Sequence, residues 1–328
     1  MTSDDLMLPI SYFGKLPAQG DFLRAANNHR PLIAILDRWA TEGLDLLAQD
    51  VAWKSLYDSA PGFNFAFMGS RHRSVIGGHL LPSVDASGRR FPFMAGVAFE
   101  VAKPLEFLAR SPLAFTRMWS HLGRELSLAK QAGEPAPILN ELSVYKANLT
   151  VSSDTLHHTF AGFLQAQTMG SLQQMLNTAG HQVDVRRILL ALGLLLRPVM
   201  STGAPKMGKG LRLPLPSDPL HRHLVSAFWL DLIAEFLGRA DFELMLLQRG
   251  EHQPTMTLGF GGASARGLYG VIDPRIEEQD TIWLADPQWV EQEVNASYAL
   301  KKMSTYTSQP ELSLSTARHT FREIFLGL

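Results

Sequence analysis

The chain has 328 residues, which is enough for about two domains. Its 30 Lys and Arg residues balance 31 Asp and Glu residues, and this near-neutral charge excludes the basic excess that marks a general nucleic-acid binder. The chain has no cysteine, which excludes disulfides, cysteine-ligated zinc, iron–sulfur clusters and a cysteine nucleophile.

The rest of the composition is that of a folded protein with a substantial core. Hydrophobic residues make up 46% of the chain and charged residues 19%. The acidic pair Asp4-Asp5 has the wrong sign for a secretory leader. The most apolar run, 188–200, is interrupted by Arg197 and Pro198 and is shorter than the ~20 residues of a membrane helix. We therefore expect a cytoplasmic location, no membrane insertion and no nucleic-acid partner.

The first part of the chain mixes strand and helix patterns. In chain order, it predicts a strand at 8–13, a Gly- and Pro-rich loop at 14–20, a helix from Pro31, strands at 63–68, 75–81 and 91–99, and helices at 111–131 and 138–149. The helix from Pro31 has one apolar face, made of Leu32, Ile35, Leu36, Trp39, Gly43, Leu46 and Leu47. The three middle strands have hairpin-like spacing, which predicts some antiparallel pairing.

The second part is richer in helix patterns. It predicts helices at 154–177, a buried strand or short helix at 188–200, a Gly- and Pro-rich loop at 201–219, a helix at 220–237, strands at 242–247, 254–260, 267–272 and 281–284, and helices at 287–302 and 314–326. The expected fold class is α/β, with a mixed sheet flanked by helices (an α/β sandwich) in an N-terminal domain at 1–135. A second, helix-rich α+β unit with a small sheet is expected at 136–328.

Two glycine-rich segments resemble phosphate-binding loops only in part. The run Gly203-Ala-Pro-Lys-Met-Gly-Lys209 fits the start of a P-loop, but Gly210 replaces the Ser or Thr that coordinates Mg²⁺. Pro214 and Pro216 follow, and they disfavour the helix that a P-loop must open. The stretch 259–264 runs on into an expected strand and is interpreted as a tight turn.

The polar residues do not form a recognisable catalytic or metal-binding pattern. His157-His158 and the pair His221 and His223 lack metal-helix spacing and are expected to be surface or capping histidines. The charged stretch 273–280, which holds Glu277-Glu278, is interpreted as a solvated loop. Tryptophans in predicted helices and strands are expected mainly in the core. We expect no catalytic residue, no metal and no cofactor.

Two segments are more specific than composition. The first, 12–24, reads Tyr-Phe-Gly-Lys-Leu-Pro-Ala-Gln-Gly-Asp-Phe-Leu-Arg, and the second, 81–93, reads Leu-Pro-Ser-Val-Asp-Ala-Ser-Gly-Arg-Arg-Phe-Pro-Phe. The helix segment Leu-Asp-Arg-Trp at 36–39 lies between them. In this order they resemble the TagF/ImpM family of type VI secretion accessory proteins, over about residues 8–130. The later half is similar to the family more loosely, mainly at 284–289.

The resemblance implies a bacterial cytoplasmic protein that controls or assists type VI secretion without known catalytic activity. Some members of the family act as post-translational repressors, linked to a forkhead-associated-domain scaffold protein and to threonine phosphorylation. The N-terminal domain of the family is an α/β sandwich. The sequence leaves open which partner is bound, whether secretion is repressed or assisted, and the oligomeric state.

The residues of these motifs fall into two groups. Those interpreted as structural are Gly14, Trp39, Pro82, Ser83, Gly88, Phe91 and Pro92. The candidate partner-binding residues are Lys15, Pro17, Gly20, Asp21, Arg24, Asp85 and Arg89. Both motifs lie at strand–loop junctions, and we expect Lys15, Asp21, Asp85 and Arg89 to cluster at one end of the sheet. Asp21 is also expected to cap local backbone or to form a local ion pair, because polar loop residues satisfy nearby backbone first.

The sequence favours a regulatory protein that acts by binding a protein of the secretion machinery. One alternative is a nucleotide-binding enzyme that uses the loop Gly203–Lys209. Another is a structural component of the secretion apparatus, which would carry large exposed apolar patches.

Overall fold

The computed structural model describes residues 5–27, 30–151, 153–202, 207–250 and 252–327. The strands are β1 (Asp5–Pro9), β2 (Ser11–Gly14), β3 (Leu23–Ala25), β4 (Phe63–Gly69), β5 (Ser74–Leu81), β6 (Phe93–Glu100), β7 (Lys146–Thr150), β8 (Gly210–Pro214), β9 (Glu243–Arg249), β10 (Thr255–Gly259) and β11 (Thr281–Trp283). The helices are α1 (Arg30–Leu47), α2 (Trp53–Ser59), α3 (Pro104–Gln131), α4 (Ala136–Val144), α5 (Ser153–Ala166), α6 (Met169–Thr178), α7 (Val185–Thr202), α8 (Pro219–Leu237), α9 (Ala265–Ile272), α10 (Pro274–Asp280), α11 (Val290–Ala296), α12 (Tyr298–Thr307) and α13 (Leu314–Leu326).

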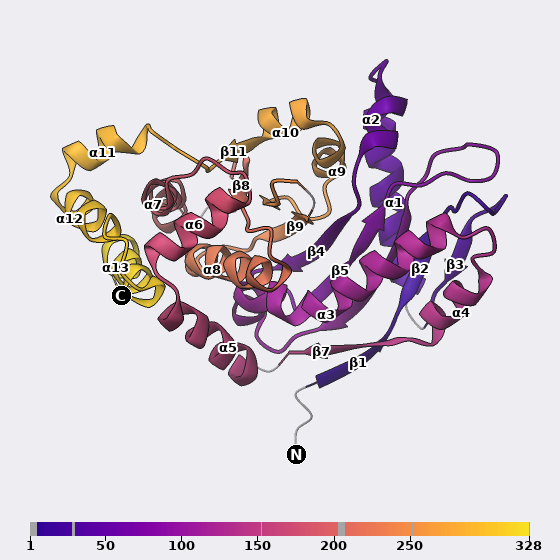
Figure 1. Ribbon diagram of the computed structural model, residues 1–328, viewed down its shortest axis with the longest axis horizontal. Coiled ribbons are helices and arrows are strands. Elements are labelled where there is room, and N and C mark those ends of the chain that lie inside the picture. Colours follow the sequence, from indigo (N-terminus) through magenta and orange to yellow (C-terminus); the bar gives the residue numbers. More distant parts are fainter. Residues whose placement is uncertain (1–4, 28–29, 152, 203–206, 251, 328) are drawn as a thin grey trace.

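A mixed sheet runs through the centre of the molecule (Figure 1). Its nine strands follow the order β11-β8-β10-β9-β4-β5-β6-β2-β3, and its pairs are antiparallel except for β11 on β8. The expected α/β class is therefore confirmed, with a helix-rich region following the N-terminal strands. The division at residue 135 remains a sequence prediction, and the sheet is continuous across it because β9 pairs with β4.

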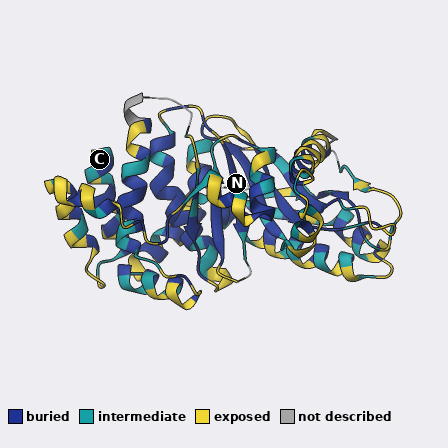
Figure 2. Cartoon of the chain, turned by 90° about the horizontal axis from the view of Figure 1, so that it is seen from above, coloured by how far each residue is buried: buried dark blue, intermediate teal, exposed yellow. Residues whose placement is uncertain are grey.

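Successive side chains of each strand point to opposite faces of the sheet, and both faces carry apolar residues. In β4, Phe65 and Phe67 pack on one face against Trp39 of α1, while Ala66 and Met68 belong to the core on the other face. Helices α1 and α9 cover the Trp39 face, and α3 and α8 cover the opposite one (Figure 1). Buried residues fill the central strands and the inner sides of the helices, with exposed residues at the periphery (Figure 2).

Most expected strands and helices of the first half are confirmed, with two corrections. The strand expected at 8–13 is two strands, β1 and β2, which belong to different sheets. The segment expected as a helix at 138–149 is instead the short helix α4 followed by the strand β7. Strand β7 pairs with β1, so that Leu149 lies opposite Leu6 and Ala147 opposite Leu8. Ala147 and Leu149 are buried at alternate positions, and pairing with a distant strand fixes the extended conformation.

Two predictions in the second half are wrong. The segment 267–272 is not a strand but the helix α9, whose first turn is capped by the Ser264 side chain. Leu268 of this helix packs against Gly43 of α1. A helix therefore buries the apolar residues of this segment better than a strand would. The loop expected at 201–219 contains the strand β8, and the undecided run 188–200 lies in the helix α7.

The helix expected at 287–302 is interrupted. It consists of α11 and α12, and Ser297 between them caps α12 by accepting a hydrogen bond from the backbone N–H of Leu300. In the part of the chain that the structure describes, no helix is long and apolar enough to cross a membrane.

Gly14 stands at the end of β2 in a conformation that other residues avoid. Its φ is +134°, and a Cβ atom there would lie 1.9 Å from the carbonyl oxygen of Pro92. The motif therefore needs glycine at this position, both for the dihedral angle and for the close approach of two backbones.

Replacing Gly14 with alanine tests this requirement. We expect Gly14→Ala to lower the free energy of unfolding by at least about 2 kcal/mol, because it adds strain and a backbone clash. Chemical denaturation followed by circular dichroism measures the change. The matched control is Gly133→Ala, where a Cβ meets nothing within 4 Å, and equal losses in both variants would contradict the argument.

Candidate functional site

The carboxylate of Asp85 binds the two sequence motifs together. Its Oδ2 accepts hydrogen bonds from Lys15 Nζ at 2.9 Å and from Arg89 Nε at 2.7 Å. Its Oδ1 accepts from the backbone N–H groups of Ser87 and Arg89 at 3.0 and 2.9 Å and from Ser87 Oγ at 2.7 Å. The Asp85 side chain is fully buried, and that of Lys15 is 7% exposed. Five donors therefore satisfy one buried carboxylate.

Further hydrogen bonds fix the first loop to the second. Arg89 Nη2 donates to the carbonyl of Gly20 at 2.8 Å, and the backbone N–H of Ala86 donates to the carbonyl of Gln19 at 2.9 Å. Of the four residues expected to cluster, the structure brings Lys15, Asp85 and Arg89 together. Asp21 is exposed, the strand β3 follows it rather than a helix, and it makes no hydrogen bond or ion pair within the described ranges.

The remaining candidates lie around this cluster. Pro17 is half-buried in the first loop, Gly20 is exposed at its end, and Arg24 is exposed on β3. Lys15 and Asp85 are buried and paired with each other, so their charges hold the loops in place and are not presented at the surface.

The hydrogen bonds set the ionisation of Asp85. Burial raises the pKa of this carboxyl, but hydrogen bonds from Ser87, Lys15 and Arg89 lower it more strongly, so the pKa lies well below the ordinary value of 3.8. Asp85 is therefore charged in the folded protein even in moderately acidic solution.

The residues interpreted as structural support the same loops. Gly88 completes the turn with a φ of +79°, and the backbone N–H and carbonyl of Ser83 both bind the hydroxyl of Tyr57, at 3.0 and 3.1 Å. Lys130 of α3 donates to the carbonyl of Pro82 at 2.7 Å. On the other face, Trp39 Nε1 donates to the carbonyl of Ser264 at 3.0 Å. Tyr57 stands outside both motifs, and sequence reasoning missed it.

Arg89 and Arg90, which both precede β6, bind different partners. Arg90 donates from Nε and Nη2 to the two carboxylate oxygens of Asp58, at 2.8 and 2.6 Å. Its guanidinium also lies 5.6 Å from the ring centroid of Trp53. The second motif is therefore bound to α2 as well as to the first loop.

One aromatic side chain of the motifs is exposed. Phe22 is 48% exposed, whereas Phe13 and Phe91 beneath it are 8% and 7% exposed. The Phe22 ring stacks on Phe13 with centroids 5.2 Å apart and meets Phe91 edge-on at 4.9 Å. Lys15 Nζ lies 4.8 Å from the same ring. We call the exposed residues Asp21, Phe22, Arg24 and Arg89 the signature surface.

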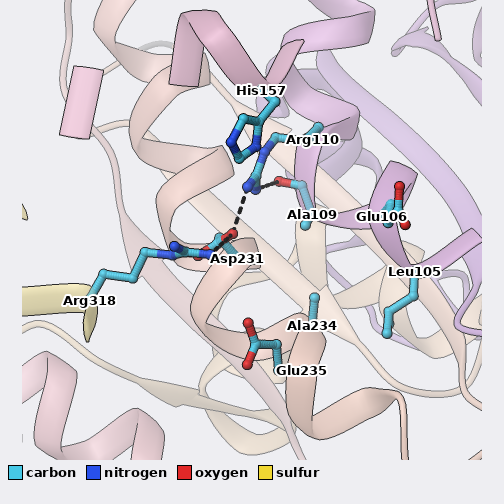
Figure 3. Close-up of a pocket in the computed structure, with 9 residues that line it drawn as sticks. All are labelled: Leu105, Glu106, Ala109, Arg110, His157, Asp231, Ala234, Glu235 and Arg318. Atoms are coloured by element: carbon cyan, nitrogen blue, oxygen red, sulfur yellow. Dashed lines mark hydrogen bonds and ion pairs between the residues drawn. The ribbon is translucent and has the colours of Figure 1, made fainter. Parts of the chain in front are cut away.

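A second polar cluster lies in a pocket of about 250 Å³ between α3, α8, α13 and α5 (Figure 3). Asp231 Oδ1 accepts from Arg110 Nη2 at 2.8 Å and from Arg318 Nη2 at 3.1 Å, and Oδ2 pairs with Arg318 Nε. Burial lowers the pKa of Arg110, and the Asp231 carboxylate opposes this shift. The Arg110 guanidinium also lies 3.9 Å from the ring centroid of Phe160. The paired charges join helices that lie far apart in the sequence.

The described residues around the glycine-rich segments lack features of a P-loop. Residues 203–206 lie outside the described residues, and Lys209 is exposed immediately before β8. A strand rather than a helix therefore follows the glycine-rich run. The stretch 259–264 does lead into a helix, α9, contrary to our expectation of a strand. Lys209 and Gly261 line the same pocket of about 430 Å³.

Two further expectations about polar residues are wrong. His223 is not at the surface but 5% exposed beside Trp119, and burial lowers its pKa to about 4. Glu277 is not in a solvated loop but on α10, where it is 2% exposed. The other histidines of these pairs lie at the surface or in the first turn of α8. Among the described residues, no group of three or more His, Asp or Glu is placed to hold a metal ion.

The low pKa of Asp85 predicts an acid-dependent contribution to stability. Because the folded pKa is below the unfolded one, the contribution is complete above the unfolded value of 3.8 and is lost as the pH falls toward the folded value. We expect Asp85→Asn to lower the free energy of unfolding at neutral pH, with a difference from the wild type that shrinks below about pH 5. Urea denaturation across this pH range measures it, and a difference that does not change with pH would contradict the assignment.

The cluster in Figure 3 predicts a large cost for removing its only shared carboxylate. Asp231→Ala leaves two arginines largely buried without their partner, and we expect a loss of about 3–5 kcal/mol in the free energy of unfolding. Glu235→Ala on the same helix is the control, because its pair with Arg322 is 25% and 32% exposed and is worth at most about 1 kcal/mol. Thermal denaturation compares the two, and similar losses would argue against the buried network.

Comparisons with known proteins agree with the motifs. No curated protein matches this chain. The crystal structure of PA0076 from Pseudomonas aeruginosa PAO1 is similar to part of it, with 21% sequence identity and a TM-score of 0.33, over 42% of this chain and 63% of PA0076. Residues 11–143 match the model of a domain family described as the TagF N-terminal domain, type VI secretion system-associated. That segment contains both motifs, the Asp85 cluster and Phe22. Residues 11–143 of this chain are therefore a TagF N-terminal domain, a domain that is associated with type VI secretion.

Proposed function

We propose that this protein is a non-enzymatic, cytoplasmic regulator of bacterial type VI secretion that acts by binding another component of the machinery. In this proposal it represses secretion after translation. Its partner is a secretion component such as a forkhead-associated-domain scaffold protein. The TagF N-terminal domain supports the pathway, and the signature surface supports the mode of action.

The exposed ring of Phe22 is the observation that carries the proposal. A half-exposed phenylalanine loses apolar contact with water when a partner covers it, and its two neighbouring rings already fix its orientation. The loop that carries it is held by the buried Lys15–Asp85 pair. Little conformational entropy is therefore lost on binding, which favours affinity.

Exposed charges of both signs lie on the same loops as this ring, because Asp21 and Arg24 flank it in the sequence and Arg89 binds the carbonyl of Gly20. Asp21, Arg24 and Arg89 are exposed, so a partner can be oriented by complementary charges. Such an arrangement supports recognition and association rate more than it supports chemistry. This arrangement of charges fits a regulator that acts by binding a surface of its partner protein.

The alternative of a nucleotide-binding enzyme has weaker support. The run that ends at Lys209 continues into the strand β8, so it lacks the helix N-terminus that binds phosphate in a P-loop. Calorimetry with millimolar nucleotide tests it directly. Binding that is lost in Lys209→Ala would favour the enzyme over the regulator.

Capture of partners from the native host tests the proposal. With the full chain as bait and the secretion apparatus expressed, we expect a forkhead-associated-domain protein or another secretion component to be recovered. Phe22→Ala should weaken the measured affinity for that component at least about tenfold, because a buried anchor contributes most of the energy at an interface.

The matched control for this experiment is Tyr298→Ala. Tyr298 is 85% exposed on α12, outside the signature surface, and its replacement should leave capture unchanged. Asp21→Lys probes the same surface without disturbing ring packing. Recovery of no secretion component, or equal loss in Tyr298→Ala and Phe22→Ala, would count against the proposal. A partner that stays bound through purification under stringent washing would favour a structural component instead.

A further inference from the structure

An open pocket of about 430 Å³ lies at the opposite end of the sheet from the signature surface. Strands β8, β9, β10 and β11 each contribute to its wall, through Arg212, Arg249, Thr255 and Trp283. The other charged or titratable residues that line it in the described chain are His181 and His252, so the lining contains no described carboxylate. Its volume is within the range of small-molecule sites.

Behind the strands that line this pocket, the carboxylate of Glu277 accepts hydrogen bonds from both Arg212 and Arg249. Glu277 Oε2 accepts from Arg212 Nη1 at 2.7 Å and from Arg249 Nη2 at 2.5 Å, and Oε1 accepts from Thr257 Oγ1 at 2.9 Å. One negative charge is thus set against two positive charges. One positive charge is therefore left uncompensated at the pocket. The buried Glu277 fixes the position of that charge.

The guanidinium of Arg212 has an unused edge. Its Nε has no hydrogen-bond partner although it is buried, and its Nη2 makes no hydrogen bond within the part of the chain that is described. In a planar guanidinium, Nε and Nη2 form one edge and point away from Nη1, which here binds Glu277. Arg90 and Arg318 use this same edge to bind the carboxylates of Asp58 and Asp231. The Nε and Nη2 groups of Arg212 therefore have no acceptor among the described residues.

An aromatic ring fixes the plane of this group. The Arg212 guanidinium lies 4.5 Å from the ring centroid of Trp283, which is 37% exposed. Every guanidinium nitrogen of Arg249, in contrast, has a partner among Thr255, Glu277 and the carbonyl of Val271. Arg212, which lines the pocket, is therefore held at Nη1 by Glu277 and over one face by Trp283.

We propose that this pocket binds the oxyanion group, a phosphate or a carboxylate, of a small soluble ligand through the guanidinium of Arg212. Two parallel N–H···O bonds to a charged acceptor are the strongest contacts that an arginine makes. The exposed face of Trp283 provides a flat apolar wall for the rest of the ligand. This inference is independent of the proposed regulatory function.

Titration of the full chain tests the proposal with two simple probes, inorganic phosphate and acetate. The readout is the indole N–H resonance of Trp283 in NMR spectra, assigned with Trp283→Phe, and sodium chloride at equal ionic strength is the blank. We expect a saturable shift of this resonance and not of the other five indole resonances. A response to phosphate alone or to acetate alone identifies the group that is bound, and both support the site. No saturable shift with either probe would overturn it.

Two variants separate the site from general charge effects. Arg212→Gln should weaken binding at least about tenfold, whereas Arg38→Gln, at an exposed position of α1, should leave it unchanged. Since Arg212 also satisfies the buried Glu277, Trp283→Leu is the second test, because it leaves the Arg212–Glu277 hydrogen bond in place and should weaken binding measured by calorimetry. Undiminished binding in folded Arg212→Gln, or equal loss in Arg38→Gln, would overturn the proposal.

Discussion

The buried carboxylate of Asp85 is the interaction on which the N-terminal domain depends. A charge without solvent is tolerated only when donors surround it, and five donors from two distant loops do so here. The loops therefore have one arrangement rather than many. This arrangement also fixes the position of Phe22, because Gln19 and Gly20 just before it are hydrogen-bonded to the second motif. The two family motifs and the signature surface therefore form one hydrogen-bonded unit.

Much of this could be predicted from the sequence. The alternation Phe63, Phe65, Phe67 predicted a strand, and the stripe that contains Trp39 predicted the helix that covers it. The grouping of Lys15, Asp85 and Arg89 followed from the position of both motifs at strand ends. What the sequence did not reveal was burial, since Lys15 and Asp85 were candidates for partner contact and the structure uses their charges internally.

Two of the errors, at β7 and at Glu277, share a physical cause, which is long-range pairing. The strand β7 has only five residues, and its pairing with the distant strand β1 makes it extended. Glu277 reads as a solvated charge because its two arginines are 65 and 28 residues away in the sequence. The helix α9 was the one error with a local signal. Ser264 three residues before Gly267 is a helix cap, and Leu268, Val271 and Ile272 have helical spacing.

The pairing of β4 with β9 also bears on how the protein is made. During synthesis the N-terminal domain leaves the ribosome first, with β5 on one side of β4 and nothing yet on the other. The bare edge belongs to a strand whose residues are mostly buried in the finished fold, Phe65 and Phe67 among them. Such an edge is a template for pairing with other chains. The nascent domain is therefore vulnerable to aggregation until translation has passed Arg249, and the second half of the chain protects the first as soon as it is made.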